Sequence, residues 1–177
     1  DLTQVETEVL NGIAPTDVTV SYYATQSHAE SDTNAIGIAT SYTNISTPQE
    51  VWIRVTYNTT GCYKVTSLEL IVHPLPVLVQ PTPLELCDDD YYASADELLS
   101  FDLTVKDQEI TGNTPSWSVS YYETQLDAET DSNVIDPATA YTNTAIGTNP
   151  SNPQTLYVRV TDTDTGCYGF TTLTIRV

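Results

Sequence analysis

Hydrophobic and polar residues alternate with a period of two along several short stretches of this chain. In residues 51–56, VWIRVT, an aliphatic side chain occupies every second position. Because successive side chains of a strand point to opposite faces of a sheet, this pattern predicts a strand with one buried and one solvated face. The same alternation recurs in residues 18–22, 68–72, 117–121, 156–160 and 173–177.

Turn residues separate the last two predicted strands of each half of the chain. NTTG at 58–61 and DTDTG at 162–166 both end in glycine, which favours a hairpin. The main helical signal is TQLDAET, where Thr124 precedes Asp127 by three residues. It predicts a single helical turn between strands.

The two halves are copies of one another. SYYATQSHAESDTNAIGIATSYTN at 21–44 matches SYYETQLDAETDSNVIDPATAYTN at 120–143 at 15 of 24 positions. The match resumes at residues 48–72 against 153–177, after six extra residues in the second copy. The numbering offset is therefore 99 before this insertion and 105 after it. The chain is therefore a tandem repeat.

The repeats divide the chain into residues 1–73 and 74–177. The joint between them, HPLPVLVQPTP at 73–83, contains four prolines, which favour a stiff and extended connection. The opening DLTQVETEVL aligns with the sequence from Asp102, so the first repeat has no counterpart of residues 74–101. Two explanations stay open: a shortened chain, or an edge that accepts a strand from another subunit.

The expected fold is all-β. Thr, Val, Ile and Tyr are abundant, and a full repeat of about 100 residues offers about seven short strands. This favours two tandem Ig-like or fibronectin-III-like antiparallel β-sandwiches, the first incomplete at its N-terminus. A jelly roll is the alternative.

Charge excludes several function classes. The chain has 24 acidic residues against 5 Lys and Arg, a formal net charge of −19 and a pI near 4.1. Nucleic acids and anionic membrane surfaces need clustered basic residues, so neither is an expected partner. No apolar run approaches the roughly 18 residues of a spanning helix, so direct membrane insertion is not expected. No signal peptide opens the chain, which we interpret as a fragment.

Three cysteines allow several pairings. Cys62 and Cys167 are equivalent, both in TGCY, while Cys87 opens the acidic stretch CDDD of the second repeat. The economical pairing joins Cys87 to Cys167 and clasps the start of a repeat to its final hairpin. The rival joins Cys62 to Cys87 across the joint, and free thiols are the third alternative. A bridge would indicate an oxidising compartment.

The first pairing predicts a metal site. It would gather carboxylates of the acidic stretch and of the hairpin before Cys167, and crowded carboxylates repel unless a cation is held between them. Calcium suits flexible loops rich in Asp. The candidate ligands are Asp88, Asp89, Asp90, Asp96, Asp162 and Asp164, with Asp102 as a further one. A solvated acidic turn is the alternative.

Aromatic residues offer a rival site. Trp52 and Tyr157 lie at equivalent positions on the predicted outward face, where rings can stack on sugars or simply cover the sheet. Arg54 and Arg159 share this face, and we expect them to pair with carboxylates. His28 and His73 mark no shared site, and no nucleophile or zinc motif is present, so we expect no enzyme activity.

Several stretches carry a resemblance to a known class of proteins. CDDD with FDL, SYYETQLDAETDSN with AYTN, and YVRVTDTDTGCY resemble the tandem repeats of large surface adhesins of Bacteroidota. Such proteins often end in a gliding-motility-associated domain and leave the cell by type IX secretion. The resemblance implies an extracellular, cell-surface, Ig-like repeat.

The sequence therefore favours a segment of a bacterial adhesin or stalk, acting as a spacer and adhesive module. Its expected partners are neighbouring repeats of the same chain and surface glycans or proteins of unknown identity. The alternative is an array of carbohydrate-binding modules attached to a secreted enzyme.

Overall fold

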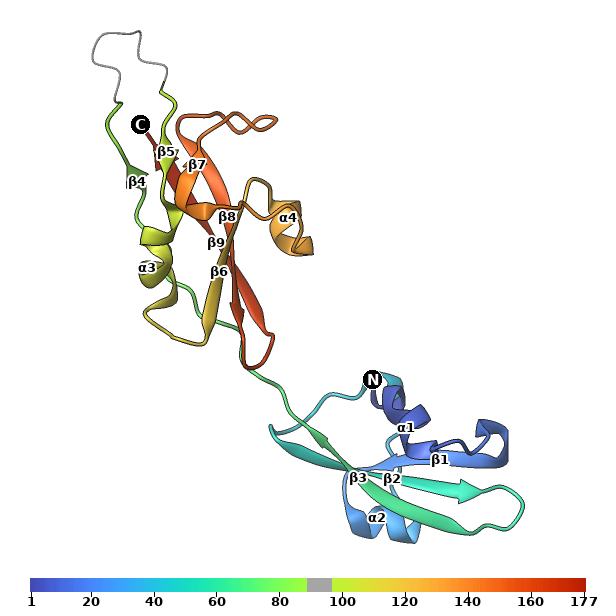
Figure 1. Cartoon of the computed structure of the whole chain (residues 1–177). Coiled ribbons are helices and arrows are strands. Elements are labelled where there is room, and N and C mark those ends of the chain that lie inside the picture. The colour runs from blue at the N-terminus through green and yellow to red at the C-terminus, as the bar shows by residue number, and fades with distance from the viewer. Residues whose placement is uncertain (89–96) are drawn as a thin grey trace. The chain divides into compact units, whose positions relative to one another are not determined.

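The computed structural model describes residues 1–88 and 97–177 and divides into two compact units, Asp1–Val72 and His73–Val177. They are called repeat 1 and repeat 2 below (Figure 1). None of the helices in the described part of the chain has the length and hydrophobicity of a membrane-spanning helix.

Repeat 1 is built on one antiparallel sheet. Its strands lie in the order β1-β2-β3, and short helices precede and follow β1. The elements are η1 (Leu2–Val5), α1 (Glu6–Leu10), η2 (Pro15–Asp17), β1 (Val18–Tyr23), α2 (Gln26–Ser31), η3 (Ala39–Ser41), β2 (Gln49–Tyr57) and β3 (Tyr63–Leu70).

Repeat 2 contains counterparts of these elements, with the exception of η2, and adds strands. Its main sheet has the order β4-β9-β8-β6, in which β4 pairs with β9 in parallel and the other pairs are antiparallel. The strands β5 and β7 form a separate pair. The elements are β4 (Leu84–Glu85), β5 (Ser100–Phe101), η4 (Leu103–Lys106), α3 (Asp107–Thr111), β6 (Trp117–Tyr122), α4 (Gln125–Thr130), η5 (Ala138–Ala140), β7 (Tyr141–Thr142), β8 (Gln154–Asp162) and β9 (Tyr168–Arg176).

The period-two pattern produces the predicted strands. In β2, Val51 and Ile53 are buried, and Ile53 lies opposite Tyr22 of β1. In β8, Leu156 and Val158 occupy the same positions and are fully buried. One face of each sheet thus forms the core, against the helical segment that begins at η1 or η4.

The predicted turns are also present. Gly61 and Gly166 adopt positive φ angles of 69° and 74°, a region that glycine enters without steric strain. The backbone bond from Tyr57 N to Cys62 O is 2.9 Å, and that from Asp162 N to Cys167 O is 2.8 Å. In both hairpins the carbonyl of the cysteine thus accepts the bond that closes the turn.

The predicted helical turn is α4, and α2 is its counterpart in repeat 1. The Thr124 hydroxyl accepts a bond from Asp127 N, and Thr25 does the same with His28 N. A threonine at this position satisfies an amide that has no partner within the helix.

The β-rich, mainly antiparallel architecture agrees with the sequence-based expectation, but a sandwich of two Ig-like sheets is not confirmed. Each repeat has one main sheet among its described residues. Short helices occupy positions where a second sheet would lie, with α1 or α3 near the core face and α2 or α4 on the other. Short amphipathic turns such as ETEVL lack the strict alternation of a strand, and the expectation of seven strands overlooked them.

Candidate functional sites: the connector groove and the cysteines

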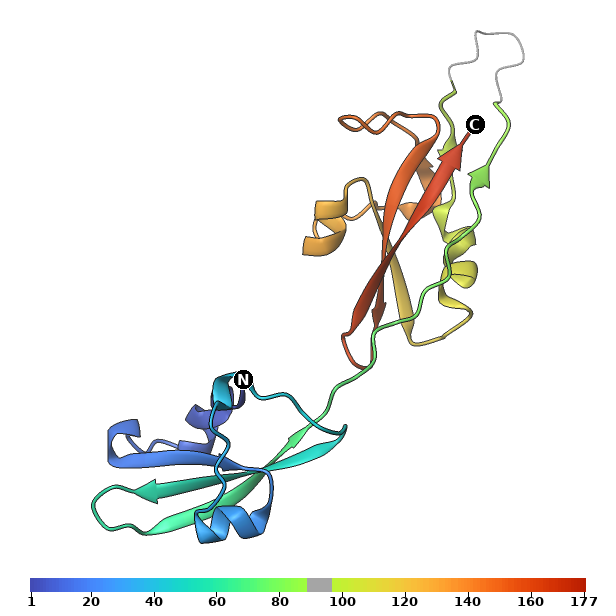
Figure 2. The same cartoon turned by 180° about the vertical axis from the view of Figure 1, so that it is seen from behind.

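Most of the proline-rich joint belongs to repeat 2. Residues 76–86, here called the connector segment, run beside β9 in the same direction (Figure 2). Gln80 Nε2 donates to Thr172 O at 2.7 Å, Leu84 pairs with Ile175, and Leu86 N donates to Arg176 O at 3.0 Å. The connector segment thus acts as the fourth strand of the sheet.

The connector segment is also held by α3, on its other side. Val79 N donates to Ile110 O at 3.1 Å, and Thr82 N donates to Glu109 Oε1 at 2.7 Å. Lys106 Nζ bonds both Glu109 and the Thr82 hydroxyl, at 3.0 and 2.7 Å. The Thr82 amide first, and Lys106 next, lower the pKa of the Glu109 carboxyl.

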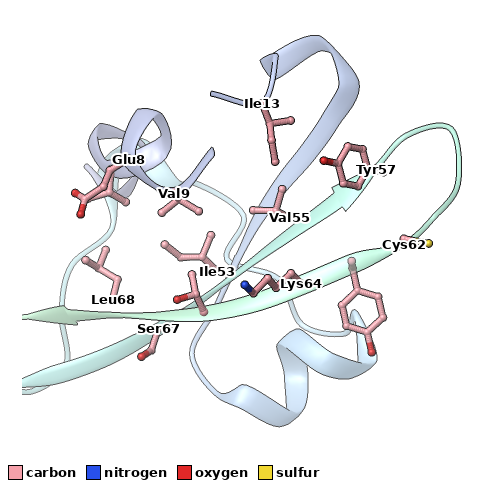
Figure 3. Close-up of a pocket in the computed structure, with 13 residues that line it drawn as sticks. Glu8, Val9, Ile13, Ile53, Val55, Tyr57, Cys62, Lys64, Ser67 and Leu68 are labelled. Carbon is pink, nitrogen blue, oxygen red and sulfur yellow. The ribbon is translucent and has the colours of Figure 1, made fainter. Parts of the chain in front are cut away.

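Repeat 1 has an open groove at the same place. It has a volume of about 560 Å³ and lies between α1 and the outer edge of β3 (Figure 3). Glu8 and Val9 line one side, Ser67 and Leu68 the other, and Ile53 lies at its base. Glu8 and Val9 are the counterparts of Glu109 and Ile110, which hold the connector segment in repeat 2.

The groove leaves core residues of repeat 1 incompletely covered. Ile110, Val160, Leu173 and Ile175 have no exposed surface in repeat 2. Their counterparts in repeat 1 are each only partly buried: Val9, Val55, Leu68 and Leu70. In repeat 2, Leu78 and Leu84 of the connector segment pack against this cluster. The difference in burial therefore coincides with the connector segment.

The structure does not bring Cys87 and Cys167 together. Cys167 directly precedes β9, whereas Cys87 follows Leu86, which bonds Arg176 at the far end of β9. The 9 residues of β9 span about 30 Å. A disulfide needs Cα atoms within about 7 Å. The economical pairing within one repeat therefore does not fit this arrangement, because the connector segment runs parallel to β9 and carries Cys87 away from the hairpin.

All three cysteine side chains are free thiols in the structure, and none is fully buried. Cys62 and Cys87 are exposed, and Cys167 is partly exposed. Each lies at an end of its repeat, since Cys62 also follows the turn that opens β3.

The described candidate calcium ligands lie at opposite ends of repeat 2, as Cys87 and Cys167 do. Asp162 and Asp164 belong to the hairpin, where Asp162 Oδ1 accepts from Asp164 N at 3.0 Å, and Asp88 lies at the other end of the repeat. Asp89, Asp90 and Asp96 lie outside the described residues. Within the described part, no group of three or more His, Cys, Asp or Glu side chains is placed to hold a metal ion. Calcium binding by the acidic stretch stays a prediction.

Asp102 has a different role from the one expected. Its Oδ1 accepts from Thr104 N at 3.0 Å and from the Thr104 hydroxyl at 2.6 Å, and it caps η4. The equivalent Asp1 caps η1 in repeat 1.

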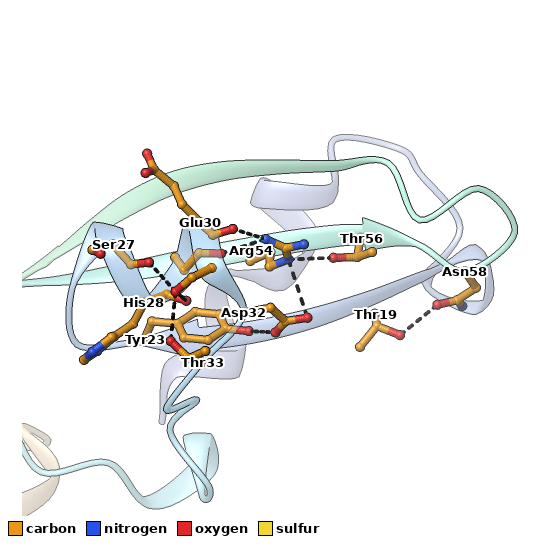
Figure 4. A network of polar contacts seen from close by, with 12 residues as sticks. Thr19, Tyr23, Ser27, His28, Glu30, Asp32, Thr33, Arg54, Thr56 and Asn58 are labelled. Atoms are coloured by element: carbon orange, nitrogen blue, oxygen red, sulfur yellow. Dashed lines mark hydrogen bonds and ion pairs between the residues drawn. The ribbon is translucent and has the colours of Figure 1, made fainter.

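The arginines of the second sheet face hold helices rather than carboxylates. Arg54 is only 8% exposed, and its Nη1 donates to Ala29 O and Glu30 O at 2.8 and 3.0 Å (Figure 4). Its guanidinium carbon lies 3.5 Å from the centroid of the Tyr63 ring. An ion pair with Asp32 at 4.0 Å is a minor addition. The expectation of carboxylate partners is thus met only in part, because the carbonyl oxygens ending α2 are nearer.

Repeat 2 has the same arrangement. Arg159 donates to Ala128 O and Glu129 O and lies over the Tyr168 ring at 3.7 Å. We call this arrangement the arginine clamp.

The aromatic pair on this face is partly buried. Trp52 lies opposite Tyr23, and Tyr157 lies opposite Tyr122. Tyr23 and Tyr122 are themselves fully buried, and their hydroxyls donate to Asp32 and Asp131 at 2.5 Å. Burial, followed by these carboxylates, raises the pKa of both tyrosines. Packing against Tyr23 and Tyr122 across the strands explains why aromatic residues occupy positions 52 and 157. Sugar binding by Trp52 and Tyr157 stays a prediction.

Comparison with known proteins gives one family. A family model described as a Flavobacterium inter-domain disulphide bond domain matches twice, at residues 1–76 and 83–177. No curated protein matches the chain.

Proposed function

Because the chain belongs to the family of Flavobacterium inter-domain disulphide bond domains, we propose that it is a section of an extracellular tandem array whose consecutive repeats are joined by disulfides. The array serves as a spacer or adhesive stalk on the surface of a Bacteroidota cell. The match to two successive repeats supports the array, and the family description supports bonds between domains.

The observation that carries this proposal is the position of the two cysteines of repeat 2. The connector segment enters beside the hairpin, where the Pro76 carbonyl lies close to Gly169, two residues after Cys167. The chain leaves at the end of β9, next to Cys87. Repeat 2 therefore carries one cysteine at its entry end and one at its exit end.

The length of the joint favours one pairing. Val72 is the counterpart of Val177 and so marks the exit end of repeat 1, and four residues lead from it to Pro76. Four residues reach at most about 14 Å. A joint this short favours a bond between the acidic-stretch cysteine of one repeat and the hairpin cysteine of the next. We assign the bond to this pair, repeated along the array.

Such bonds explain the combination of sequence features. A disulfide that spans the joint prevents consecutive repeats from separating under load, and the prolines limit bending. Many weak contacts from a long array give avidity without a deep pocket in any one repeat. Disulfides of this kind persist in an oxidising, extracellular setting.

The pairing is tested in a protein that joins two copies of residues 73–177. After oxidative refolding, peptide mapping without reduction is expected to find Cys87 of the first copy bonded to Cys167 of the second. Cys87→Ser in the first copy abolishes this bond, whereas Cys167→Ser in the first copy, the matched control, leaves it intact. A bond between Cys87 and Cys167 of one copy would contradict the proposal.

The rival function is tested separately. If the array is a carbohydrate-binding module, glycan-array binding will be present and will be lost in Trp52→Ala or Tyr157→Ala. The spacer proposal expects neither substitution to change adhesion of the array.

A further inference from the structure

We propose that the groove of repeat 1 binds an extended segment of the same sequence type as residues 76–86, supplied from outside residues 1–177, as a parallel fourth strand beside β3. This inference does not depend on the disulfide pairing. It assigns the groove an occupant of defined chemistry: a proline-punctuated strand with leucines directed to the core and backbone amides directed to α1.

The polar groups that hold such a strand are already in place. Thr171 and Thr172, which bond Gln80 in repeat 2, correspond to Thr66 and Ser67 on the edge of β3. Both repeats therefore offer a hydroxyl and a strand carbonyl to an incoming glutamine. Glu8 stands where repeat 2 has Glu109, whose carboxylate accepts from the Thr82 amide.

The apolar groups are in place as well. Val9, Val55 and Leu68 line the groove or its floor and are only partly buried, while their counterparts in repeat 2 are fully buried beneath Leu78 and Leu84. A strand with leucines at the same two positions would complete the burial. Apolar burial and edge-strand hydrogen bonds then stabilise the complex together.

The edge of β3 is available for pairing. In repeat 1, which the structure describes throughout, β3 pairs with β2 and no strand lies on its other side. Exposed edges of this kind are templates for an added strand. The strand is expected to run parallel to β3, because β4 runs parallel to β9.

One substitution distinguishes the groove from the occupied site. Lys64 stands where repeat 2 has Gly169, and a Cβ at Gly169 would lie 3.1 Å from the Pro76 carbonyl oxygen. The occupant of repeat 1 therefore lies slightly farther from β3 at this point.

The first experiment adds a synthetic peptide of residues 74–86, PLPVLVQPTPLEL, to the intact 177-residue chain. Saturable binding is expected, with NMR shifts at Thr66 and Ser67, while repeat 2, whose site is filled, serves as the internal reference. Glu8→Ala is expected to weaken binding about tenfold, or about 1.4 kcal/mol. Glu50→Ala, which removes an equal charge outside the groove, leaves it unchanged. A scrambled peptide that binds equally well, or shifts confined to repeat 2, would overturn the proposal.

The second experiment determines whether the bound peptide runs parallel or antiparallel to β3. The chain carries Cys87→Ser and Cys167→Ser, so that Cys62 at one end of the groove is the remaining thiol. In a glutathione buffer, whose oxidised form accepts the two electrons, a peptide with Leu75→Cys is expected to form a disulfide with Cys62. A peptide with Leu86→Cys is not. Preferential bonding of the second peptide contradicts the parallel arrangement, and self-association of the chain through the groove contradicts the proposed occupant.

Discussion

At the scale of single residues, the arginine clamp connects the sheet to its short helices. Arg54 and Arg159 are long cations, yet both lie against strands and donate to the last carbonyls of a helix. These carbonyls have no partner within the helix, and the negative end of the helix dipole favours a cation there. The nearby tyrosine ring adds a cation–π contact.

Arg159→Lys is therefore expected to reduce the free energy of unfolding by about 1–2 kcal/mol, because an ammonium loses the planar contacts of the guanidinium. Arg176→Lys is the matched control. Arg176 pairs with Glu85 on the surface, and the change should alter stability by less than about 1 kcal/mol. Urea denaturation followed by circular dichroism measures both. Equal losses of stability in Arg159→Lys and Arg176→Lys would show that the arginine clamp contributes no more than a surface ion pair.

Glu109 gives a pH prediction. Its pKa is lowered in the folded state from a reference of 4.5, so its contribution is present above that pH and is lost as pH falls through the lower folded value. Glu109→Gln should flatten the dependence of the denaturation midpoint on pH below about 4.5. Glu69→Gln, on the exposed side of β3, is the control, and an unchanged slope in Glu109→Gln would contradict the assignment.

At the scale of elements, the connector segment determines whether the core and the sheet edge of a repeat are covered. It fills the space between α3 and β9 in repeat 2, and the same space is a groove in repeat 1. Gly169 permits this close approach, since its position faces the Pro76 carbonyl.

Gly169→Ala should loosen the connector segment and reduce stability by about 1–3 kcal/mol, the usual effect of inserting a methyl group into a packed site. Lys64→Ala, at the equivalent position of repeat 1, meets no connector and should change stability little. Hydrogen exchange at the Val79 and Leu86 amides gives the readout. Unchanged protection of these amides in Gly169→Ala would contradict the role assigned to this contact.

How far the sequence predicts these elements depends on whether the determining contact is local. The strands around Val51 and Leu156, the turns at Gly61 and Gly166, and the capped helix at Thr124 follow from patterns within a few residues. The course of the connector segment does not. Its bonds to β9 join residues about 90 positions apart, such as Gln80 and Thr172, and proline content predicts only that it is extended. The position of Cys87 depends on that course, so cysteine order alone does not show that Cys87 and Cys167 lie at opposite ends of β9. The sequence does not predict the arginine clamp, because its acceptors are backbone carbonyl oxygens, which every residue type carries.

At the scale of the whole chain, the two repeats should differ in stability. Repeat 1 leaves four core residues partly exposed that repeat 2 buries completely. The chain has two tryptophans, and Trp52 and Trp117 report on one repeat each.

We expect Trp117→Phe, which leaves the reporter in repeat 1, to show unfolding at lower denaturant than Trp52→Phe, which leaves it in repeat 2. A saturating peptide of residues 74–86 should raise only the first transition, by about 2.7 kcal/mol at a concentration 100 times its Kd. Coincident transitions without peptide would show that the groove leaves repeat 1 no weaker.

In the array that we propose, each cysteine of a repeat is bonded to a neighbouring repeat and not within its own. The most direct test is a peptide map, without reduction, of the monomeric 177-residue chain after refolding in a glutathione redox buffer. We predict that Cys62, Cys87 and Cys167 are all unlinked to one another, each free or capped by glutathione. A peptide linking Cys87 to Cys167, or Cys62 to Cys87, would contradict it.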